Sequence, residues 1–473
     1  MWATVKARLQ GLSLSRWGPS SWGVTERLLV LTVALGVALR VAWILYAHPH
    51  PLDGGGRFDD SRFYFLSARR LADGDGFLSA RSLSNGDGSQ FPLIAEATAA
   101  WPPGYSFLLA GMFKVLDFFK LFGASDDWVL RAIVDAGRAV NILAAAVTIV
   151  LVYAIGRRVF DKPVALVGAF LVAIFPGQIY FTSILLTEVI FTAVALTLIY
   201  VLLRLRERGR APPAWAVLAF GAVMGFSALF RGEAVIIVGL ALLFWRWLVP
   251  DWRTFAWQAS LLIVGVVIAI APWTIRNAVA MNAFVPITSG VCHHFWHGHN
   301  PDAYESLTVS AAIARIQEPY QNLSSTEREI ESEQAFCSEA SKFIREQPLQ
   351  EFPLLVKKAY YFLANDSSSL EWIQTKPTIP ADDVVHLSRL ADFVYFTVLA
   401  LAVAGAPVWW SRKPELLLLL GVIAGWIVLH MLLFPLPRYH QPIMPIVSLL
   451  AAAGLVALWR QSRQRPPPEE GRD

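Results

Sequence analysis

The sequence predicts an all-α polytopic membrane protein, a bundle of about ten or eleven transmembrane helices. Of its 473 residues 55% are hydrophobic and only 16% are charged, whereas soluble domains carry about 25% charged residues. The mean hydropathy is +0.48. Apolar runs long enough to cross a bilayer recur from residue 28 to residue 459. Because a backbone in lipid must satisfy its own hydrogen bonds, these runs are expected to be helices.

Basic residues in short connections indicate the orientation of the helices. Lys6, Arg8, Arg16 and Arg27 precede the first run, which places the N-terminus in the cytoplasm. Later basic clusters mark the same side: Arg157, Arg158 and Lys162; Arg204, Arg206, Arg208 and Arg210; Arg246 and Arg253; Arg412 and Lys413; Arg460, Arg463 and Arg465. The ten predicted spans are 28–47, 135–156, 163–181, 183–203, 213–230, 233–249, 256–274, 389–411, 415–434 and 441–459. The net charge of +4 therefore reports membrane orientation, and no nucleic-acid partner is expected.

The apolar run 104–122 does not fit this alternation. As a further crossing it would invert every later loop, and it contains Lys114, Asp117 and Lys120. We therefore expect a re-entrant or interfacial helix on the outer face. The alternative is eleven spans, with one basic loop on the wrong side.

Two large outer loops divide the chain. The expected units are a cytoplasmic N-terminus 1–27, a transmembrane module 28–274 with outer loop 48–134, a large outer loop 275–388, transmembrane helices 389–459 and a disordered cytoplasmic tail 460–473. Cys292 and Cys337 both fall in the second loop, in a compartment where a disulfide can persist. The sequence does not decide whether they pair. Amphipathic helices are expected over 325–360, either shaping an acceptor site or only covering the outer face.

Asp59 and Asp60 immediately precede a stretch, 61–71, whose apolar residues recur at helical spacing, as in a helix that lies along the interface. One interpretation is an N-terminal cap, because carboxylates stabilise the positive end of a helix. The other is a carboxylate at the membrane surface that binds a cation or deprotonates an acceptor hydroxyl.

Further short motifs follow this acidic pair in a fixed order. They are Leu-Ala-x-Gly-x-Gly-Phe at 71–77, Pro-Pro-Gly-Tyr at 102–105, Ser-Ile-Leu-Leu-Thr-Glu at 183–188, Ala-Pro-Trp-Thr-Ile-Arg-Asn at 271–277, Gly-His-Asn-Pro at 298–301 and Pro-Arg-Tyr-His-Gln-Pro at 437–442. Their order resembles the GT-C superfamily of membrane glycosyltransferases, nearest to the prokaryotic protein O-mannosyltransferase and aminoarabinose-transferase group. The resemblance covers nearly the whole chain and implies a GT-C-type bundle with interfacial helices in two outer loops. At 298–301 that family usually has Gly-Asn-Asn-Pro.

The resemblance also implies roles for individual residues. It carries the catalytic acidic residue onto Asp59, with Asp60 as second choice, and a second acidic residue onto Glu188. A phosphate is held best by arginine, and Arg231, Arg276 and Arg438 all lie at outer ends of spans. We expect them, with Tyr439, to bind the donor phosphate. The alternative for each arginine is snorkelling toward the interface.

Four histidines lie within residues 293–299, next to Cys292. One interpretation is a Zn²⁺ site. The other is a loop, favoured by Gly298 and by Asn300 before a proline, that lines the sugar. The expected lining residues are Trp296, which would stack on the sugar ring, and His297, His299, Asn300 and His440.

Together, motifs and loops predict a glycosyltransferase of the inner (cytoplasmic) membrane with its active site on the outer face. It would transfer a sugar from a polyprenyl-phosphate donor to a hydroxyl of a glycan, lipid or protein, among membrane lipids. The family includes members that use a divalent cation such as Mg²⁺ or Mn²⁺ and members that use none, and the Asp59–Asp60 pair permits either. A lipid-linked-sugar transporter would need ionisable residues deep in its spans, whereas here they lie mainly at outer ends. An inactive assembly subunit is the other alternative.

Overall fold

The computed structural model describes residues 23–49, 60–78, 96–209, 211–303, 306–374, 379–409 and 414–464. Within these ranges the regular secondary structure is helical, apart from a single antiparallel bridge between Leu78 and Ala97. The predicted all-α class is confirmed. Asp59, the first choice for the catalytic carboxylate, lies outside the described residues.

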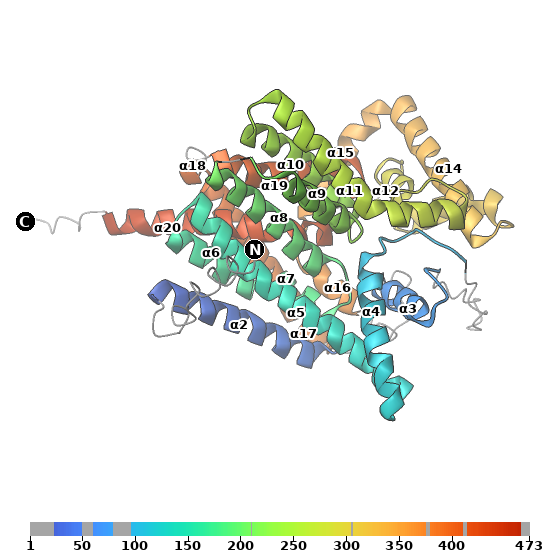
Figure 1. Ribbon diagram of the computed structural model, residues 1–473, viewed down its shortest axis with the longest axis horizontal. Helices are drawn as coiled ribbons and strands as arrows, with labels where there is room; N and C mark the ends of the chain where they lie inside the picture. The colour runs from blue at the N-terminus through green and yellow to red at the C-terminus, as the bar shows by residue number, and fades with distance from the viewer. Residues whose placement is uncertain are drawn as a thin grey trace, which may run out of the picture.

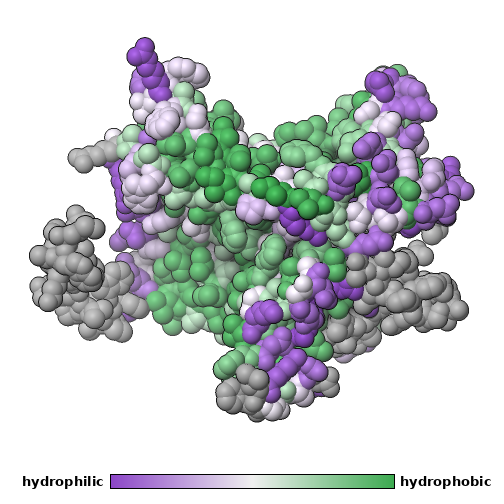
Figure 2. Space-filling model, turned by 45° about the vertical axis from the view of Figure 1, so that its right-hand side comes forward, coloured by the Kyte–Doolittle hydropathy of each residue, from purple (hydrophilic) through white to green (hydrophobic). Residues whose placement is uncertain are grey.

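Seven of the described helices are long and apolar enough to cross a membrane. They are α2 (Val24–Ala47), α5 (Asp126–Val159), α8 (Glu188–Arg208), α11 (Trp252–Met281), α17 (Ala381–Ala404), α19 (Pro414–Leu432) and α20 (Met444–Gln464). The protein is therefore a multi-pass membrane protein. On the face drawn in Figure 2, hydrophobic residues cover much of the middle, and hydrophilic residues lie mostly toward the periphery.

The remaining predicted spans take bent or short forms. Helices α6 (Lys162–Ile174) and α7 (Pro176–Tyr180) with η4 (Phe181–Ser183) make one span bent by 58°, because Pro176 cannot continue the preceding helix. Helices α9 (Ala214–Ala228) and α10 (Val235–Leu248) have 15 and 14 residues. The predicted span 183–203 begins later, at Glu188, because residues 184–187 are not helical.

Glycines bring α9 and α11 into close contact. A Cβ atom on Gly221 would lie 2.1 Å from the carbonyl oxygen of Leu262, and one on Gly265 would lie 2.3 Å from that of Leu218. Backbones that approach this closely need small residues at the crossing, as is common between membrane helices. The packing fixes the end of α9, where Arg231 follows.

Further, shorter elements connect the candidate spans, and several of them lie at the end of the bundle opposite the C-terminus (Figure 1). They are α3 (Asp60–Asp73), α4 (Gly104–Asp117), η3 (Phe118–Phe122), η5 (Gly232–Ala234), α12 (Val291–Gly298), α13 (Ser306–Gln317), η6 (Glu318–Tyr320), α14 (Ser325–Glu346), α15 (Pro348–Leu363), α16 (Ser368–Gln374) and η7 (Pro437–Ile443), while the short α18 (Ala406–Trp409) follows α17. Helix α4, with 14 residues, is about 21 Å long. Neither α4 nor η3, which continues it to Phe122, is among the seven helices that are long and apolar enough to cross a membrane.

Glu329 on α14 connects the two outer loops. Its carboxylate accepts hydrogen bonds from the Thr98 hydroxyl at 2.7 Å and the Ala99 backbone N–H at 2.9 Å in the first loop. It also accepts one from the Ser289 hydroxyl at 2.6 Å in the second loop. The described parts of the two loops therefore form one layer over the helix bundle.

Candidate active site

Asp60 begins α3 and points toward the C-terminal helices. One carboxylate oxygen accepts a hydrogen bond from the Trp101 indole at 3.2 Å, and the other accepts one from Arg438 at 2.8 Å. Arg438 lies in η7, far along the chain. The fold thus brings a predicted catalytic residue onto a predicted phosphate-binding residue, and the Asp60 side chain remains 18% exposed.

Glu188 is the first residue of α8 and its side chain is only 3% exposed. Its Oε1 atom lies 2.9 Å from Arg231 and 3.9 Å from Arg438. Its Oε2 atom is buried and makes no hydrogen bond within the described part of the chain. A buried carboxylate is costly unless it is paired, and both Arg231 and Arg438 approach Glu188.

Two further residues, Glu233 and His430, complete this site and were missed from the sequence. Arg231 donates to Glu233 at 2.9 Å, and the Nε2 atom of His430 lies 4.0 Å from Glu233. Burial alone would raise the pKa of Glu233, but Arg231 and His430 outweigh it, and the pKa falls to about 2. A signal existed, since Glu233 lies at a junction between spans and His430 within one, where ionisable residues are rare.

We call Asp60, Glu188, Arg231, Glu233 and Arg438 the acid–arginine cluster. It holds three carboxylates and two guanidinium groups from α3, α8, η5, η7 and the end of α9. The Tyr439 ring lies 5.2 Å from the guanidinium carbon of Arg438 and 5.6 Å from that of Arg231. Tyr439 is thus placed beside both arginines. The cluster can bind an anion between its guanidinium groups while a carboxylate lies next to it.

Arg276 does not join this cluster. Its guanidinium donates to the backbone oxygens of Thr98, at 2.8 Å, and of Phe77. It also lies over the ring of Trp273, 4.9 Å from the centroid. These contacts attach the first outer loop to α11. The expected convergence of three arginines is therefore a convergence of two.

The expected sugar-lining loop is a helix, α12, of which Gly298 is the last residue, while Asn300 lies just beyond it. Trp296 is 4% exposed and packs on Phe336 of α14, so its ring faces the core of the outer layer. His297 lies 3.2 Å from His293 between their Nε2 atoms. Asn300 donates to the backbone oxygen of Trp296 at 2.7 Å, which fixes the end of the helix.

His299 and His440 also have protein partners on both ring nitrogens. His299 contacts Glu351 at 2.9 Å through Nδ1 and Lys358 at 3.0 Å through Nε2, which attaches α12 to α15. His440 is 1% exposed and contacts the Phe362 backbone oxygen and the Asp366 carboxylate. Both therefore hold helices together in this structure. Their predicted role in lining the sugar has no support from these contacts.

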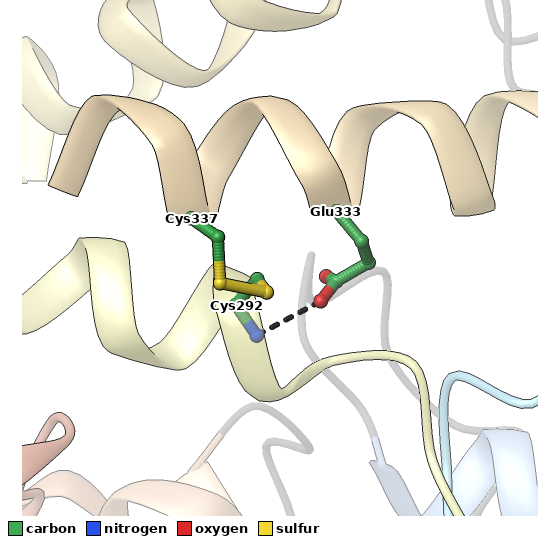
Figure 3. Close-up of a disulfide and its surroundings, with 3 residues drawn as sticks. All are labelled: Cys292, Glu333 and Cys337. Carbon is green, nitrogen blue, oxygen red and sulfur yellow. Dashed lines mark hydrogen bonds between the residues drawn. A yellow bond between two sulfur atoms is a disulfide. The ribbon is translucent and has the colours of Figure 1, made fainter. Parts of the chain in front are cut away.

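Cys292 and Cys337 form a disulfide between α12 and α14 (Figure 3). Cys292 is therefore not available as a zinc ligand, which removes one ligand from the predicted alternative. Among the described residues, no group of three or more His, Cys, Asp or Glu side chains is arranged to hold a metal ion.

Residues 102–275, less than half of the chain, match the family described as dolichyl-phosphate-mannose-protein mannosyltransferase. A search of curated protein sequences found no match. Among solved structures, the Archaeoglobus fulgidus oligosaccharyltransferase in its apo form aligns with 96% of this chain and 53% of its own, at 16% identity and a TM-score of 0.52. The same enzyme in complex with Zn and sulfate aligns over 92% and 49%, at 17% identity and a TM-score of 0.51.

ArnT from Cupriavidus metallidurans bound to undecaprenyl phosphate aligns with 94% of this chain and 82% of its own, at 17% identity and a TM-score of 0.39. We draw nothing from that lower score. The chain spans about half the length of the oligosaccharyltransferase, and the likeness to it establishes the fold. The sequence match and the shared fold together confirm the resemblance to the GT-C superfamily of membrane glycosyltransferases.

Proposed function

We propose that this protein is a membrane glycosyltransferase that moves a sugar from a polyprenyl-phosphate donor to an acceptor hydroxyl. The observation that carries the proposal is the acid–arginine cluster, where Arg231 and Arg438 arrive from different elements and meet at Glu188. Asp60 contacts one of those arginines directly at 2.8 Å. An anion site beside a carboxylate is what this transfer requires.

In this proposal Arg231 and Arg438 bind the leaving phosphate. A sugar linked to a polyprenyl monophosphate carries one negative charge on its phosphodiester, and the released polyprenyl phosphate carries nearly two. Arg231 and Arg438 stabilise the charge that develops as the bond breaks, because guanidinium groups bind phosphate oxygens in pairs. Glu188, at 3% exposure, is too buried to meet an acceptor and instead orients both arginines.

Asp60 is the carboxylate best placed to act as general base. It is more exposed than Glu188 and is oriented from two sides by Trp101 and Arg438. The acceptor O–H proton passes to the carboxylate, the acceptor oxygen bonds to the anomeric carbon, and the bond from that carbon to the phosphate oxygen breaks. This single displacement inverts the anomeric centre. Asp59 stays the alternative base, on the resemblance alone.

We place the site on the outer face of the cytoplasmic membrane. Arginines that mark the cytoplasmic side, such as Arg206 and Arg460, belong to the inner ends of α8 and α20. The cluster lies where α8 and η7 begin, at the opposite ends of these elements. The Cys292–Cys337 disulfide supports the same side, since such bonds persist outside the cytoplasm.

The test is sugar transfer by the purified protein in liposomes, from a panel of radiolabelled polyprenyl-phosphate sugars that begins with dolichyl-phosphate mannose. We expect Asp60→Asn to lower turnover by about 100-fold or more, because it removes the general base. The matched control is Asp126→Asn, since Asp126 is 81% exposed at the start of α5.

A larger loss in Asp59→Asn than in Asp60→Asn would move the base to Asp59. Transfer from no donor by folded wild-type protein would overturn the proposal and favour the transporter or assembly-subunit alternatives. Activity that survives EDTA would show that no divalent cation is needed.

A further inference from the structure

Asp366 is a buried carboxylate that the proposed reaction does not use. It follows α15 in the chain, and its side chain is 0% exposed. Among the described residues no arginine or lysine pairs with it, and its one basic partner is His440, 3.3 Å away. Because a buried carboxylate is costly unless hydrogen bonds satisfy it, the partners of Asp366 show which elements it holds together.

The two oxygens of Asp366 join two elements. Its Oδ2 atom accepts a hydrogen bond from the backbone N–H of Gly177 at 2.9 Å, near the start of α7. Its Oδ1 atom accepts one from the side-chain amide of Gln441 in η7 and lies 3.3 Å from the Nε2 atom of His440. The carboxylate therefore lies between the bent span and η7, the element that carries Arg438.

The contact between α7 and η7 is closely packed. A Cβ atom on Gly177 would lie 2.5 Å from Oδ2 of Asp366 and 2.5 Å from the Nε2 atom of Gln441. Any larger residue at this position would displace the carboxylate or the amide. On the other side, the Gln178 amide donates to the backbone oxygen and to the side-chain oxygen of Gln441, both at 2.9 Å. Gln441 is thus held from two directions.

The segment that carries Asp366 is fixed by α17. Asp392 on this helix accepts hydrogen bonds from the backbone N–H groups of Asp366 and Ser367, each at 2.9 Å. The His440 ring stacks on Tyr395 of the same helix, with 4.6 Å between the ring centroids. Asp366 therefore connects η7 to two of the candidate spans, the bent span and α17.

The element η7 depends on such outside contacts. It is a 3-10 helix of seven residues that includes Pro437 and Pro442, and prolines bring no backbone N–H to its hydrogen bonds. Arg438 lies in this element together with His440 and Gln441, and it donates to Asp60 at 2.8 Å. A shift of η7 would therefore move the guanidinium group of Arg438 within the acid–arginine cluster.

We propose that Asp366 is a positioning residue, which holds η7 so that Arg438 meets the phosphate of the donor. The inference rests on the proposed function and adds to it a residue that acts through Arg438 and does not touch the substrate. A carboxylate suits this place because both of its oxygens accept hydrogen bonds. The isosteric amide of asparagine would turn an NH₂ group toward another donor, either the Gly177 N–H or the Gln441 amide.

The experiment compares wild type with Asp366→Asn in two assays. One is binding of dolichyl phosphate and of undecaprenyl phosphate to the detergent-solubilised protein, and the other is transfer from the best donor of the liposome panel. We expect affinity and kcat/KM each to fall about tenfold or more, because displacing a phosphate-binding group is costly. In an Arg438→Gln background the same change should cost less than about twofold, since the residue through which it acts is gone.

Two further variants complete the test. Gln441→Ala breaks the contact from the η7 side and should behave like Asp366→Asn. Asp161→Ala is the matched control, because Asp161 accepts a hydrogen bond from the Val164 backbone N–H at 3.0 Å at the other end of the same bent span. It should lower the melting temperature and leave both assays at the wild-type value.

Equal losses for Asp366→Asn in the wild-type and Arg438→Gln backgrounds would overturn the proposal, since general destabilisation does not depend on Arg438. Lipid-phosphate binding that is unchanged in both Asp366→Asn and Gln441→Ala would overturn it as well. Absence of turnover in wild type, with binding that still depends on Asp366, would overturn the proposed function alone. Wild type that binds neither lipid phosphate would overturn both.

Discussion

Arginine–carboxylate pairs occur at both ends of this bundle, and their surroundings separate them. At the end that carries the basic clusters, Arg206 lies 3.1 Å from Glu415 and Arg460 lies 2.7 Å from Asp161. At the site, Arg231 lies 2.9 Å from Glu188. The distances are alike, but the four side chains at the basic end are 26–46% exposed, whereas those of Arg231 and Glu188 are 8% and 3% exposed.

Burial decides what an arginine–carboxylate pair costs the folded protein. An exposed pair contributes about 0–1 kcal/mol to stability. A buried pair must overcome the desolvation of both ions and is often no more stable than apolar residues would be. The five charged groups of the acid–arginine cluster therefore favour a role in binding. Similar ion-pair distances do not indicate similar roles.

The largest expected effect is a difference in activity between variants of the two ends. Arg438→Gln should lower sugar transfer about 100- to 1,000-fold, because it removes a donor aimed at the developing phosphate charge. Arg460→Gln, in an exposed pair, should change the rate by less than about twofold. Both are measured in the liposome assay, and equal losses in the two variants would refute a special role for the buried end.

The next effect is on stability. Glu188→Gln should destabilise the protein by about 3 kcal/mol, because it leaves Arg231 and Arg438 without the carboxylate that both approach. Glu207→Gln removes the partner of Arg158 at 43% exposure and should cost less than about 1 kcal/mol. Thermal unfolding in detergent compares them, and a smaller loss for Glu188→Gln than for Glu207→Gln would contradict the burial argument.

The smallest expected effect concerns Glu333, a half-buried carboxylate that pairs with no arginine among the described residues. Burial raises the pKa of Glu333 to about 7, although backbone N–H groups of Cys292 and His293 oppose this. A raised carboxyl pKa favours the folded state at low pH, so stability falls as pH rises from about 4.5 to 7. Glu333→Gln should therefore stabilise the protein at pH 8 by about 1 kcal/mol but not at pH 4. The measurement is the melting temperature of both proteins from pH 4 to pH 8. The same change of melting temperature with pH in wild type and in Glu333→Gln would contradict the prediction.

The sequence allowed the helical class, most span positions and part of the site to be predicted. Span ends are readable because they coincide with changes in hydropathy, and Glu188, Arg231 and Arg438 lie at such ends. Hydropathy predicts how deep in the membrane a residue lies, and it predicts the same depth for these three residues. It does not state which way a side chain points, so Arg276 and Trp296 were expected at the site and face elsewhere.

Helices were expected over 61–71 and 325–360 in the outer loops and are present as α3, α14 and α15, but the way these loops pack escaped prediction. Their contacts join residues far apart in the chain, as Arg438 joins Asp60 and Cys337 joins Cys292. Short-range patterns cannot reveal such partners. Gly298 and Asn300 favoured a loop, although Gly298 is the last residue of α12 and Asn300 lies just after the helix. Glu233 and His430 could have been singled out as ionisable residues at or within spans, but their contact with each other and with Arg231 is known only from the structure.

Glu329 connects α14 to the residues that orient Asp60. Its carboxylate ties α14 to Thr98 and Ala99, and two residues beyond Ala99 the Trp101 indole holds Asp60. Hydrogen bonds and a short stretch of backbone thus connect α14 to Asp60, the proposed base. If the acceptor docks against α14, we expect a displacement of that helix to reach the indole that orients Asp60, because two hydrogen bonds and a few residues of backbone join them.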